Sequence, residues 1–501
     1  MSVKMVRVQL EPLSAVIDVP RGASLIAELP ALGVEFPCGG TGLCGGCGIR
    51  IVAGTLPITE QDREIFSAAD LASGWRLACQ ARVDSPLVIE CEQWQMEILG
   101  DDAGGTTTAR TGLGIAIDLG TTTIAAQMLN LATGSVIAVE SLLNPQASFG
   151  SDVMSRVRAS MDGDDLRTGL LVALRETILR LAQGREAEIV EVVLVGNTVM
   201  HHLFCGLDVE PLSRTPFHSP HLAEQCFEPR ALGWPLPDAC RVRFLHCLGG
   251  FVGSDILAGI VAVGMAESEK LIALVDLGTN GEIAIGSRKR IVCASTAAGP
   301  AFEAGAIHMG MRAATGAISR VRIDGDGLHA TVIGGGEARG ICGSGLVDAV
   351  AAGLSNGAIS VSGHIADGTK IFLVQPPVLL TQADVRELQL AKGAIASGFR
   401  LLLKHLGAEA SDLRAIYLAG AFGNYVQVES AIKIGLIEAP KEQIHAAGNT
   451  ALRGAKMLLQ SEREQSLPEI THVSLAADPS FQDEYVSCMG FPTFPRELKR
   501  I

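Results

Sequence analysis

Stretches in which apolar and polar side chains alternate open the chain. Val6-Arg-Val-Gln-Leu10 and Ala15-Val-Ile-Asp-Val19 both show a period of two, and only four residues separate them. Such alternation places one face of a strand against a core, so the pattern predicts a β-hairpin. Ser24 is expected to cap a short helix that continues to Leu32. Further strands are expected at 49–52 and 87–91.

Longer apolar strands and one long helix are expected in the rest of the chain. Apolar positions from Thr381 to Leu406 follow helical spacing and begin with Thr381-Gln-Ala-Asp384, which predicts a capped core helix. Residues 100–112 contain no large apolar side chain and predict a flexible linker. We therefore expect one domain at 1–99 and a second at 113–501, with lobes of roughly 113–270 and 271–501.

Composition and charge narrow the class of protein. The chain is 48% hydrophobic but only 4% aromatic, and it contains 57 glycines, which suits an α/β protein rich in tight turns. The formal charge of −14 argues against general binding to nucleic acid or to anionic membranes. The N-terminus runs directly into a predicted strand without a signal peptide, and the longest apolar stretch, 256–266, is too short to span a bilayer. We expect a cytoplasmic protein that contacts neither nucleic acid nor membrane.

Four cysteines indicate a metal cluster. Cys38, Cys44 and Cys47 are spaced C-x5-C-x2-C in a glycine-rich run, and Cys79 follows later in the chain. This is the spacing of a [2Fe–2S] ferredoxin, whose cluster takes four thiolates from one loop and one distant point. The glycines of the run permit positive φ angles and a close approach to the cluster. The sequence therefore predicts a [2Fe–2S] cluster in an α+β, β-grasp-like ferredoxin domain.

Zinc and disulfides are the rival explanations for these cysteines. Structural zinc sites usually use two short C-x2-4-C pairs, and only one such pair is present here. A disulfide framework suits short secreted chains better than a chain of this length. The remaining cysteines, including Cys91, show no metal spacing, and we expect them to be inert thiols.

An Asp-Leu-Gly-Thr sequence occurs twice, each time after an apolar strand and before a second strand. The Asp reaches the end of its strand, the Gly permits a sharp turn, and the Thr hydroxyl and nearby N–H groups can donate to phosphate oxygens. A plain hairpin turn is the alternative for one copy alone, whereas two copies indicate two related lobes. The candidate residues are Asp118 and Asp276 as catalytic residues that hold Mg²⁺ through water, and Gly120, Thr121, Thr122, Thr123, Gly278, Thr279, Asn280 and Gly281 as phosphate-binding residues.

Two later glycine-rich segments are candidates for the same nucleotide site. In Ala415-Ile-Tyr-Leu-Ala-Gly-Ala-Phe-Gly-Asn-Tyr-Val426 an apolar strand runs into a turn and then a predicted helix, which is the layout of a backbone pressed against a nucleotide. In Ile341-Cys-Gly-Ser-Gly-Leu-Val-Asp348 the glycines precede a predicted helix whose N-terminus could meet phosphate or ribose. The candidate nucleotide-binding residues are Gly343, Ser344, Gly345, Gly420, Gly423 and Asn424.

Some other polar residues have two interpretations. Asn197 and Thr198 stand between a predicted strand and helix, where a helix cap and a nucleotide contact are both reasonable. His201 and His202 have no metal-spaced partner, so we expect ordinary helix positions. Asp255 and Glu303 could position water for hydrolysis or could be turn carboxylates.

Taken together, the two phosphate motifs and the later glycine motif resemble the acetate and sugar kinase/Hsp70/actin (ASKHA) superfamily. That resemblance implies an α/β ATPase whose two RNase-H-like lobes close over ATP. Within the superfamily, several segments resemble the reductive activators of corrinoid proteins. These are Asn144-Pro-Gln146, Gly150-Ser-Asp-Val153, Val195-Gly-Asn-Thr-Val-Met-His-His202, Gly249-Gly-Phe-Val-Gly-Ser-Asp255, Ala298-Gly-Pro-Ala-Phe-Glu303 and the 341–348 segment.

The resemblance implies an enzyme that hydrolyses ATP and passes one electron through its [2Fe–2S] cluster to a corrinoid protein. Inactive Co(II) would return to Co(I) for methyl transfer. The implied cofactors are the cluster, ATP and Mg²⁺, and the implied partners are a corrinoid protein of a methyltransferase system and a low-potential electron donor. A homodimer is left open. Unlike the longer members of the family, the chain is expected to lack an additional middle domain.

Two other functions remain open from the sequence. The first is an ATPase that activates a different acceptor, as in the activators of 2-hydroxyacyl-CoA dehydratases, although those bind a [4Fe–4S] cluster across a dimer and lack the ferredoxin domain expected here. The second is a redox-sensing kinase or chaperone-like binding module. Binding of a corrinoid protein would separate the first hypothesis from both.

Overall fold

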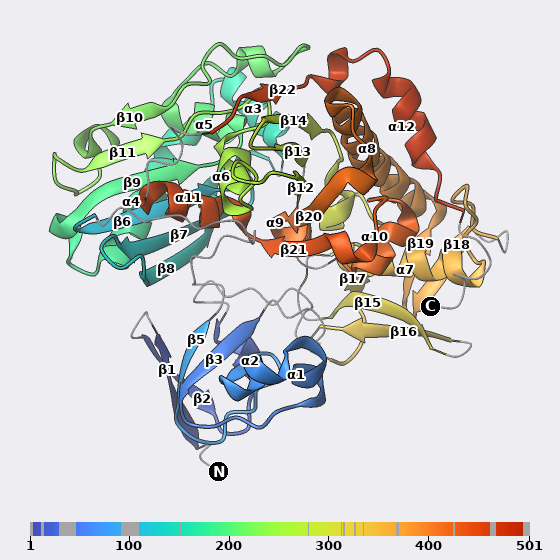
Figure 1. Ribbon diagram of the computed structural model, residues 1–501, viewed down its shortest axis with the longest axis horizontal. Coiled ribbons are helices and arrows are strands. Elements are labelled where there is room, and N and C mark those ends of the chain that lie inside the picture. Colours follow the sequence, from blue (N-terminus) through green and yellow to red (C-terminus); the bar gives the residue numbers. More distant parts are fainter. Residues whose placement is uncertain are drawn as a thin grey trace. The chain divides into compact units, whose positions relative to one another are not determined.

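The computed structural model describes residues 4–11, 15–29, 47–91, 110–150, 152–278, 280–311, 313, 316–324, 327–333, 335–366, 370–423, 426–460 and 467–493 (Figure 1). The chain forms two units. Unit 1 consists of residues 1–267 and 449–468, and unit 2 consists of residues 268–448 and 469–501. The linker expected at 100–112 lies outside the described residues up to position 109.

A five-stranded sheet forms the N-terminal part of unit 1. Its order is β2-β1-β5-β3-β4, in which β1 and β5 are parallel and the other pairs are antiparallel. The side chains of Val6, Val8 and Leu10 alternate inward from β1 into the core. All four strands expected from the alternating pattern are confirmed. The strands are β1 (Met5–Glu11), β2 (Ala15–Pro20), β3 (Gly48–Ala53), β4 (Trp75–Leu77) and β5 (Leu87–Cys91).

Two short helices between β3 and β4 were not expected from the sequence. α1 (Glu60–Ile65) and α2 (Ala68–Ala72) both begin with a capping box. The buried carboxylate of Asp62 also accepts a hydrogen bond from the Leu77 N–H at 2.8 Å, which attaches α1 to β4. The helix expected from Ser24 is a 3₁₀ turn over Leu25–Ala27 in the described residues, and the Ser24 side chain makes no capping hydrogen bond.

The rest of unit 1 is built on a six-stranded sheet of order β10-β11-β9-β6-β7-β8. β6, β7 and β8 form an antiparallel meander, while β9 and β11 join the other side of β6 in parallel. Leu113, Ile115 and Ile117 of β6 lie in the core of this unit. The strands are β6 (Leu113–Leu119), β7 (Thr123–Asn130), β8 (Val136–Leu143), β9 (Ile189–Val195), β10 (Gln225–Phe227) and β11 (Arg241–Phe244).

Helix α11 (Thr450–Gln460) completes unit 1 although it lies far along the chain. It packs against α6 (Ser254–Ala262), as the adjacent dark red and green helices in Figure 1 show. A Cβ atom on Gly454 would lie 1.8 Å from the Ala258 carbonyl oxygen, so only glycine permits this crossing. The other helices of unit 1 are α3 (Val153–Met161), α4 (Leu166–Ala182) and α5 (Thr198–Cys205).

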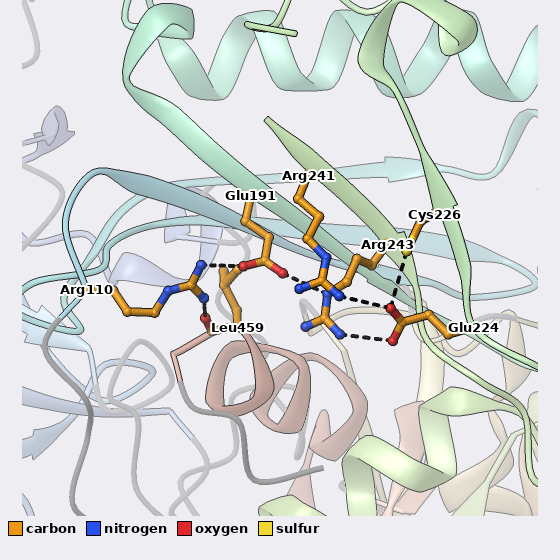
Figure 2. A network of polar contacts seen from close by, with 7 residues as sticks. All are labelled: Arg110, Glu191, Glu224, Cys226, Arg241, Arg243 and Leu459. Carbon is orange, nitrogen blue, oxygen red and sulfur yellow. Dashed lines mark hydrogen bonds and ion pairs between the residues drawn. The ribbon is translucent and has the colours of Figure 1, made fainter. Parts of the chain in front are cut away.

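An ion-pair network joins β9 and β11 to Arg110, which lies just before β6 (Figure 2). The buried Glu191 carboxylate lies 2.5 Å from Arg110 and 2.7 Å from Arg243. Arg243 also pairs with Glu224 at 2.9 Å, and Arg110 donates to the Leu459 carbonyl of α11. Two guanidinium groups therefore compensate one buried carboxylate.

Unit 2 repeats the sheet of unit 1. Its order is β21-β20-β12-β13-β14-β22, with β12, β13 and β14 antiparallel and with β20 and β21 parallel to β12. Five strands of each sheet therefore correspond in order and direction. They are β11-β9-β6-β7-β8 in unit 1 and β21-β20-β12-β13-β14 in unit 2. The predicted relationship between two lobes is confirmed by this topology. The strands are β12 (Leu271–Leu277), β13 (Gly281–Ser287), β14 (Arg290–Thr296), β20 (Leu413–Ala419), β21 (Ile444–Gly448) and β22 (Ile470–His472).

The long helix expected in unit 2 is confirmed as α8 (Gln382–Leu406), with Thr381 and Asp384 forming its capping box. Leu388, Ile395 and Leu402 of this helix are fully buried. Across the described part of the chain, none of the helices combines the length and apolar character needed to cross a membrane. The other elements of unit 2 are β15 (Ala317–Asp324), β16 (Gly327–Val332), β17 (Gly340–Ile341), β18 (Ile371–Gln375), β19 (Val378–Thr381), α7 (Gly343–Asn356), α9 (Gly420–Gly423), α10 (Val428–Ile434) and α12 (Phe481–Met489).

Candidate iron–sulfur and nucleotide sites

Strand pairing brings two of the four candidate cluster ligands together. Cys47 directly precedes β3, and Cys79 follows β4 by two residues. Gly48 pairs with Leu77, and the Ala78 N–H donates to the Cys47 carbonyl at 3.0 Å. Cys38 and Cys44 lie outside the described residues.

The surroundings of Cys47 and Cys79 suit a cluster. Both residues are buried, and the Gln80 side-chain amide lies 3.5 Å from the Cys79 sulfur as a hydrogen-bond donor. Hydrogen bonds to the sulfur ligands help to set the potential of an iron–sulfur cluster. The described residues include only two of the four candidate ligands, and among them no group of three or more His, Cys, Asp and Glu side chains is arranged to hold a metal ion. The burial of Cys47 and Cys79 and the hydrogen bond from Gln80 are compatible with two ligands of a [2Fe–2S] cluster.

The first phosphate motif forms the turn between β6 and β7 in unit 1. Gly120 is required there because a Cβ atom would lie 2.5 Å from the Thr123 carbonyl oxygen. The Asn144 side chain donates to the Gly120 carbonyl at 2.8 Å, and Asn197 donates to the Thr121 hydroxyl at 2.9 Å. Two asparagines from other segments therefore fix the conformation of this turn.

Asp118 is the penultimate residue of β6, two positions before Gly120 of the first turn. Its carboxylate accepts a hydrogen bond at 2.8 Å from Asn449, the residue that precedes α11. The side chain keeps partial exposure to solvent. A residue 331 positions along the chain therefore helps to fix this carboxylate beside the first turn.

The second phosphate motif forms the matching turn between β12 and β13 in unit 2. Gly278 donates its N–H to the Asn280 carbonyl at 3.1 Å, and the Gly281 carbonyl accepts a hydrogen bond from Thr296 at 3.0 Å. Thr279 lies outside the described residues. Asp276 keeps partial exposure, yet desolvation by the surrounding protein raises its pKa to about 6.

The third glycine motif lies against Asp276. Gly420 directly follows β20 and has a φ of +80°, and a Cβ atom there would lie 2.3 Å from a carboxylate oxygen of Asp276. A Cβ atom on Gly423 would approach the Leu418 backbone to 3.0 Å. Asn424 lies outside the described residues. The structure thus brings the second and third motifs together, and Gly420 contacts the carboxylate through its backbone.

The Gly343-Ser-Gly345 segment is held by packing within unit 2. A Cβ atom on Gly343 would lie 1.7 Å from the Phe302 carbonyl oxygen, and one on Gly345 would lie 2.2 Å from the Ile318 carbonyl oxygen. The buried Ser344 hydroxyl donates to the Ser319 carbonyl at 2.9 Å. Both glycines therefore have a structural reason, separate from any contact with a nucleotide.

Several polar residues of the first lobe have structural partners. Asn197 caps α5 through a hydrogen bond from the Met200 N–H at 2.9 Å, and this adds to its contact with the Thr121 hydroxyl. His202 is buried and bonded to the Thr198 carbonyl and the Ser219 hydroxyl, both at 2.7 Å. The expectation that His202 is an ordinary helix residue agrees with these contacts.

The sequence reasoning did not single out Asn144, Arg156 or Asn449 as site residues. Asn144 and Arg156 both bond to backbone carbonyls of the 120–122 turn, and Asn449 bonds to Asp118. Asn144 does belong to one of the segments on which the family resemblance rests, so that resemblance was the available signal.

Family models match almost the whole chain. Residues 8–84 match the 2Fe-2S iron-sulfur cluster binding domain, residues 113–268 match the RACo middle region, and residues 270–499 match the C-terminal domain of RACo, the ASKHA domain. The expectation that the chain lacks the middle domain of this family is therefore wrong. Residues 113–268, interpreted from the sequence as the first ATPase lobe, match the RACo middle region.

Individual relatives agree with these matches. The corrinoid activation enzyme RamQ of Eubacterium limosum is 35% identical over 416 residues, which cover 74% of this chain and 69% of RamQ. The [Co(II) methylated amine-specific corrinoid protein] reductase of Methanosarcina barkeri is 27% identical, with 76% and 77% covered. A solved structure of a reductive activator for corrinoid, iron-sulfur protein superposes with a TM-score of 0.65 at 25% identity and covers 98% of this chain and 99% of that one. From these matches and the fold, the chain belongs to the family of reductive activators of corrinoid proteins.

Proposed function

We propose that this enzyme uses ATP to drive the transfer of one electron to a corrinoid protein, returning its Co(II) to Co(I). The proposal rests on one observation: the chain combines two kinds of site. Strands β3 and β4 bring Cys47 and Cys79 close together, and two other sheets each carry an Asp-Leu-Gly-Thr turn. A ferredoxin alone would not need the two turns. A kinase or chaperone alone would not need the cysteines.

Energetics explain why both parts belong together. When bound, a plant-type [2Fe–2S] cluster supplies one-electron transfer at about −400 mV, and reduction of Co(II) corrinoid requires a lower potential. A shortfall of about 100–200 mV corresponds to roughly 2–5 kcal/mol, because about 59 mV changes a one-electron equilibrium tenfold. Binding or hydrolysis of ATP can supply this energy if it shifts a conformational equilibrium of the protein or of its corrinoid partner.

The residues have distinct roles in this proposal. Cys38, Cys44, Cys47 and Cys79 would hold the cluster, and the turns after β6 and β12 would hold the phosphates of ATP. Asp118 and Asp276 would orient Mg²⁺ through water. A low-potential electron donor would reduce the protein before each turnover, and assembly as a homodimer stays a prediction.

Each of the four cluster cysteines is expected to be required. Cys38→Ala, Cys44→Ala, Cys47→Ala and Cys79→Ala should each lose the cluster, because a [2Fe–2S] cluster needs four thiolate ligands. Cys91→Ala is the matched control and should keep the cluster. Iron, acid-labile sulfide and the visible spectrum of each purified variant measure the result. Full cluster content in Cys47→Ala, or complete loss in Cys91→Ala, would contradict the assignment.

Reduction of a corrinoid partner tests the function directly. Reduced protein with ATP and Mg²⁺ should convert a partner's Co(II) to Co(I), or to methyl-Co(III) when a methyl donor is present, and the cobalt spectrum reports this. Three changes should each stop the conversion. Omission of ATP removes the energy input, Asp276→Ala removes a residue of the nucleotide site, and Cys44→Ala removes the electron carrier. Equal reduction with and without ATP, with an electron donor that cannot reduce the corrinoid by itself, would show that the ATPase serves another purpose.

A further inference from the structure

Arg156 carries a buried positive charge directly behind the first phosphate turn. Its side chain, on α3, is fully buried. Desolvation lowers its pKa to about 10, although the nearby Asp152 carboxylate opposes this shift, so the guanidinium stays protonated at neutral pH. Asp152 itself accepts hydrogen bonds from the N–H and the hydroxyl of Ser155, at 2.9 and 2.6 Å.

The hydrogen-bond partners of Arg156 in the described residues are all neutral. The guanidinium donates to the Thr121 carbonyl at 2.5 Å and the Gly150 carbonyl at 3.1 Å, and it lies 3.5 Å from the Gln146 side-chain oxygen and 3.6 Å from the Met200 sulfur. A buried cation without a bonded carboxylate is costly. An anion bound nearby would offset that cost.

The hydrogen bond from Arg156 to the Thr121 carbonyl, together with one from Asn144, sets the direction of the peptide groups in the turn. The Gly120 carbonyl is held by the Asn144 side chain and the Thr121 carbonyl by Arg156. In a trans peptide the N–H of the next residue points the opposite way from the carbonyl. The N–H groups of Thr121 and Thr122 therefore point away from Asn144 and Arg156, and neither donates to another group in the described part of the chain.

We propose that Arg156 is a positioning residue for the phosphates of ATP. It holds the Thr121 carbonyl inward, so the N–H groups of Thr121 and Thr122 form an anion-binding concavity. Its buried charge also attracts the phosphates through the turn. This inference rests on the proposed binding of ATP at the turn and adds the residue that shapes it.

Nucleotides with and without phosphates separate this role from general support of the fold. Arg156→Met should weaken binding of the non-hydrolysable analogue AMP-PNP with Mg²⁺ by at least about tenfold, as expected for loss of a charged hydrogen bond. Binding of adenosine should be unchanged, because adenosine carries no phosphate. Arg156→Lys keeps the charge, but an ammonium group cannot bond two carbonyls as the planar guanidinium does. Its affinity for AMP-PNP should therefore lie between those of the wild type and Arg156→Met. Calorimetric titration of the full chain gives each Kd.

Arg158→Gln is the matched control, because Arg158 lies on the same helix but is exposed and paired with Asp162. It should bind both ligands as the wild type does. Equal weakening of AMP-PNP and adenosine binding in Arg156→Lys, or unchanged AMP-PNP binding in Arg156→Met, would overturn the inference. A wild-type protein that binds no AMP-PNP would overturn the proposed function together with this inference, so that failure is distinguishable.

Discussion

Asp118→Ala and Asp276→Ala should each lower the rate of Mg²⁺-dependent ATP hydrolysis by about a hundredfold or more. If these carboxylates orient Mg²⁺ as we propose, the loss of either one removes several kcal/mol of charge stabilisation, and each 1.36 kcal/mol is about tenfold in rate. The visible spectrum of the cluster should be unchanged, because Cys47 and Cys79 flank strands β3 and β4 of a separate sheet. Phosphate release and absorption spectra of the same samples measure both properties. Wild-type turnover in both variants would leave the two turns as simple hairpins.

Gly420→Ala offers an independent approach to Asp276. The added methyl group would lie 2.3 Å from the Asp276 carboxylate and should displace it, so hydrolysis should fall although Asp276 itself is intact. Gly407→Ala is a close control, because Gly407 has a φ of +64° but no atom within 4 Å of its Cβ position. Both variants experience the strain of positive φ, and only Gly420→Ala places an atom against the carboxylate.

Glu191→Gln should lower the free energy of unfolding by about 1.5–3 kcal/mol. It would remove the buried carboxylate that accepts hydrogen bonds from Arg110 and Arg243 (Figure 2), whereas Arg243 would keep its ion pair with Glu224. Urea unfolding followed by circular dichroism measures the shift in midpoint.

Glu228→Gln is the control for that change. Glu228 pairs with Arg230 at 2.6 Å, but both side chains are more than half exposed, so the loss should stay below about 1 kcal/mol. Similar shifts of the urea midpoint in Glu191→Gln and Glu228→Gln would mean that the buried ion pairs of Glu191 stabilise the fold no more than an exposed ion pair does.

The sequence predicted the elements whose pattern is local. Alternation identified β1, β2, β3 and β5, and the repeated Asp-Leu-Gly-Thr identified the central hairpins of both large sheets. α1 and α2 were missed because each has only five or six residues, although Thr59 and Ser67 begin capping boxes that could have revealed them.

The candidate site was predictable only as far as its turns. Residues that support the turns come from distant segments: Asn144 is 24 residues from Gly120, Arg156 is 35 from Thr121, and Asn449 is 331 from Asp118. Sequence reasoning assigned Gly343 to nucleotide contact, whereas the structure also gives it a close contact with the Phe302 backbone. A contact between backbone groups of distant segments leaves no periodic signal in a single sequence.

Helix α11 limits how this protein can be divided or recombined. Unit 1 takes residues 449–468 from between strands β21 and β22 of unit 2, and Gly454 fits against the Ala258 carbonyl of α6. A chain cut after residue 267 would leave the surface of α6 that faces α11 uncovered, and such apolar surfaces favour aggregation. Exchange of the first lobe between relatives must therefore carry two separate gene segments, and a single crossover between the two family-model regions would join an α6 and an α11 that did not evolve together.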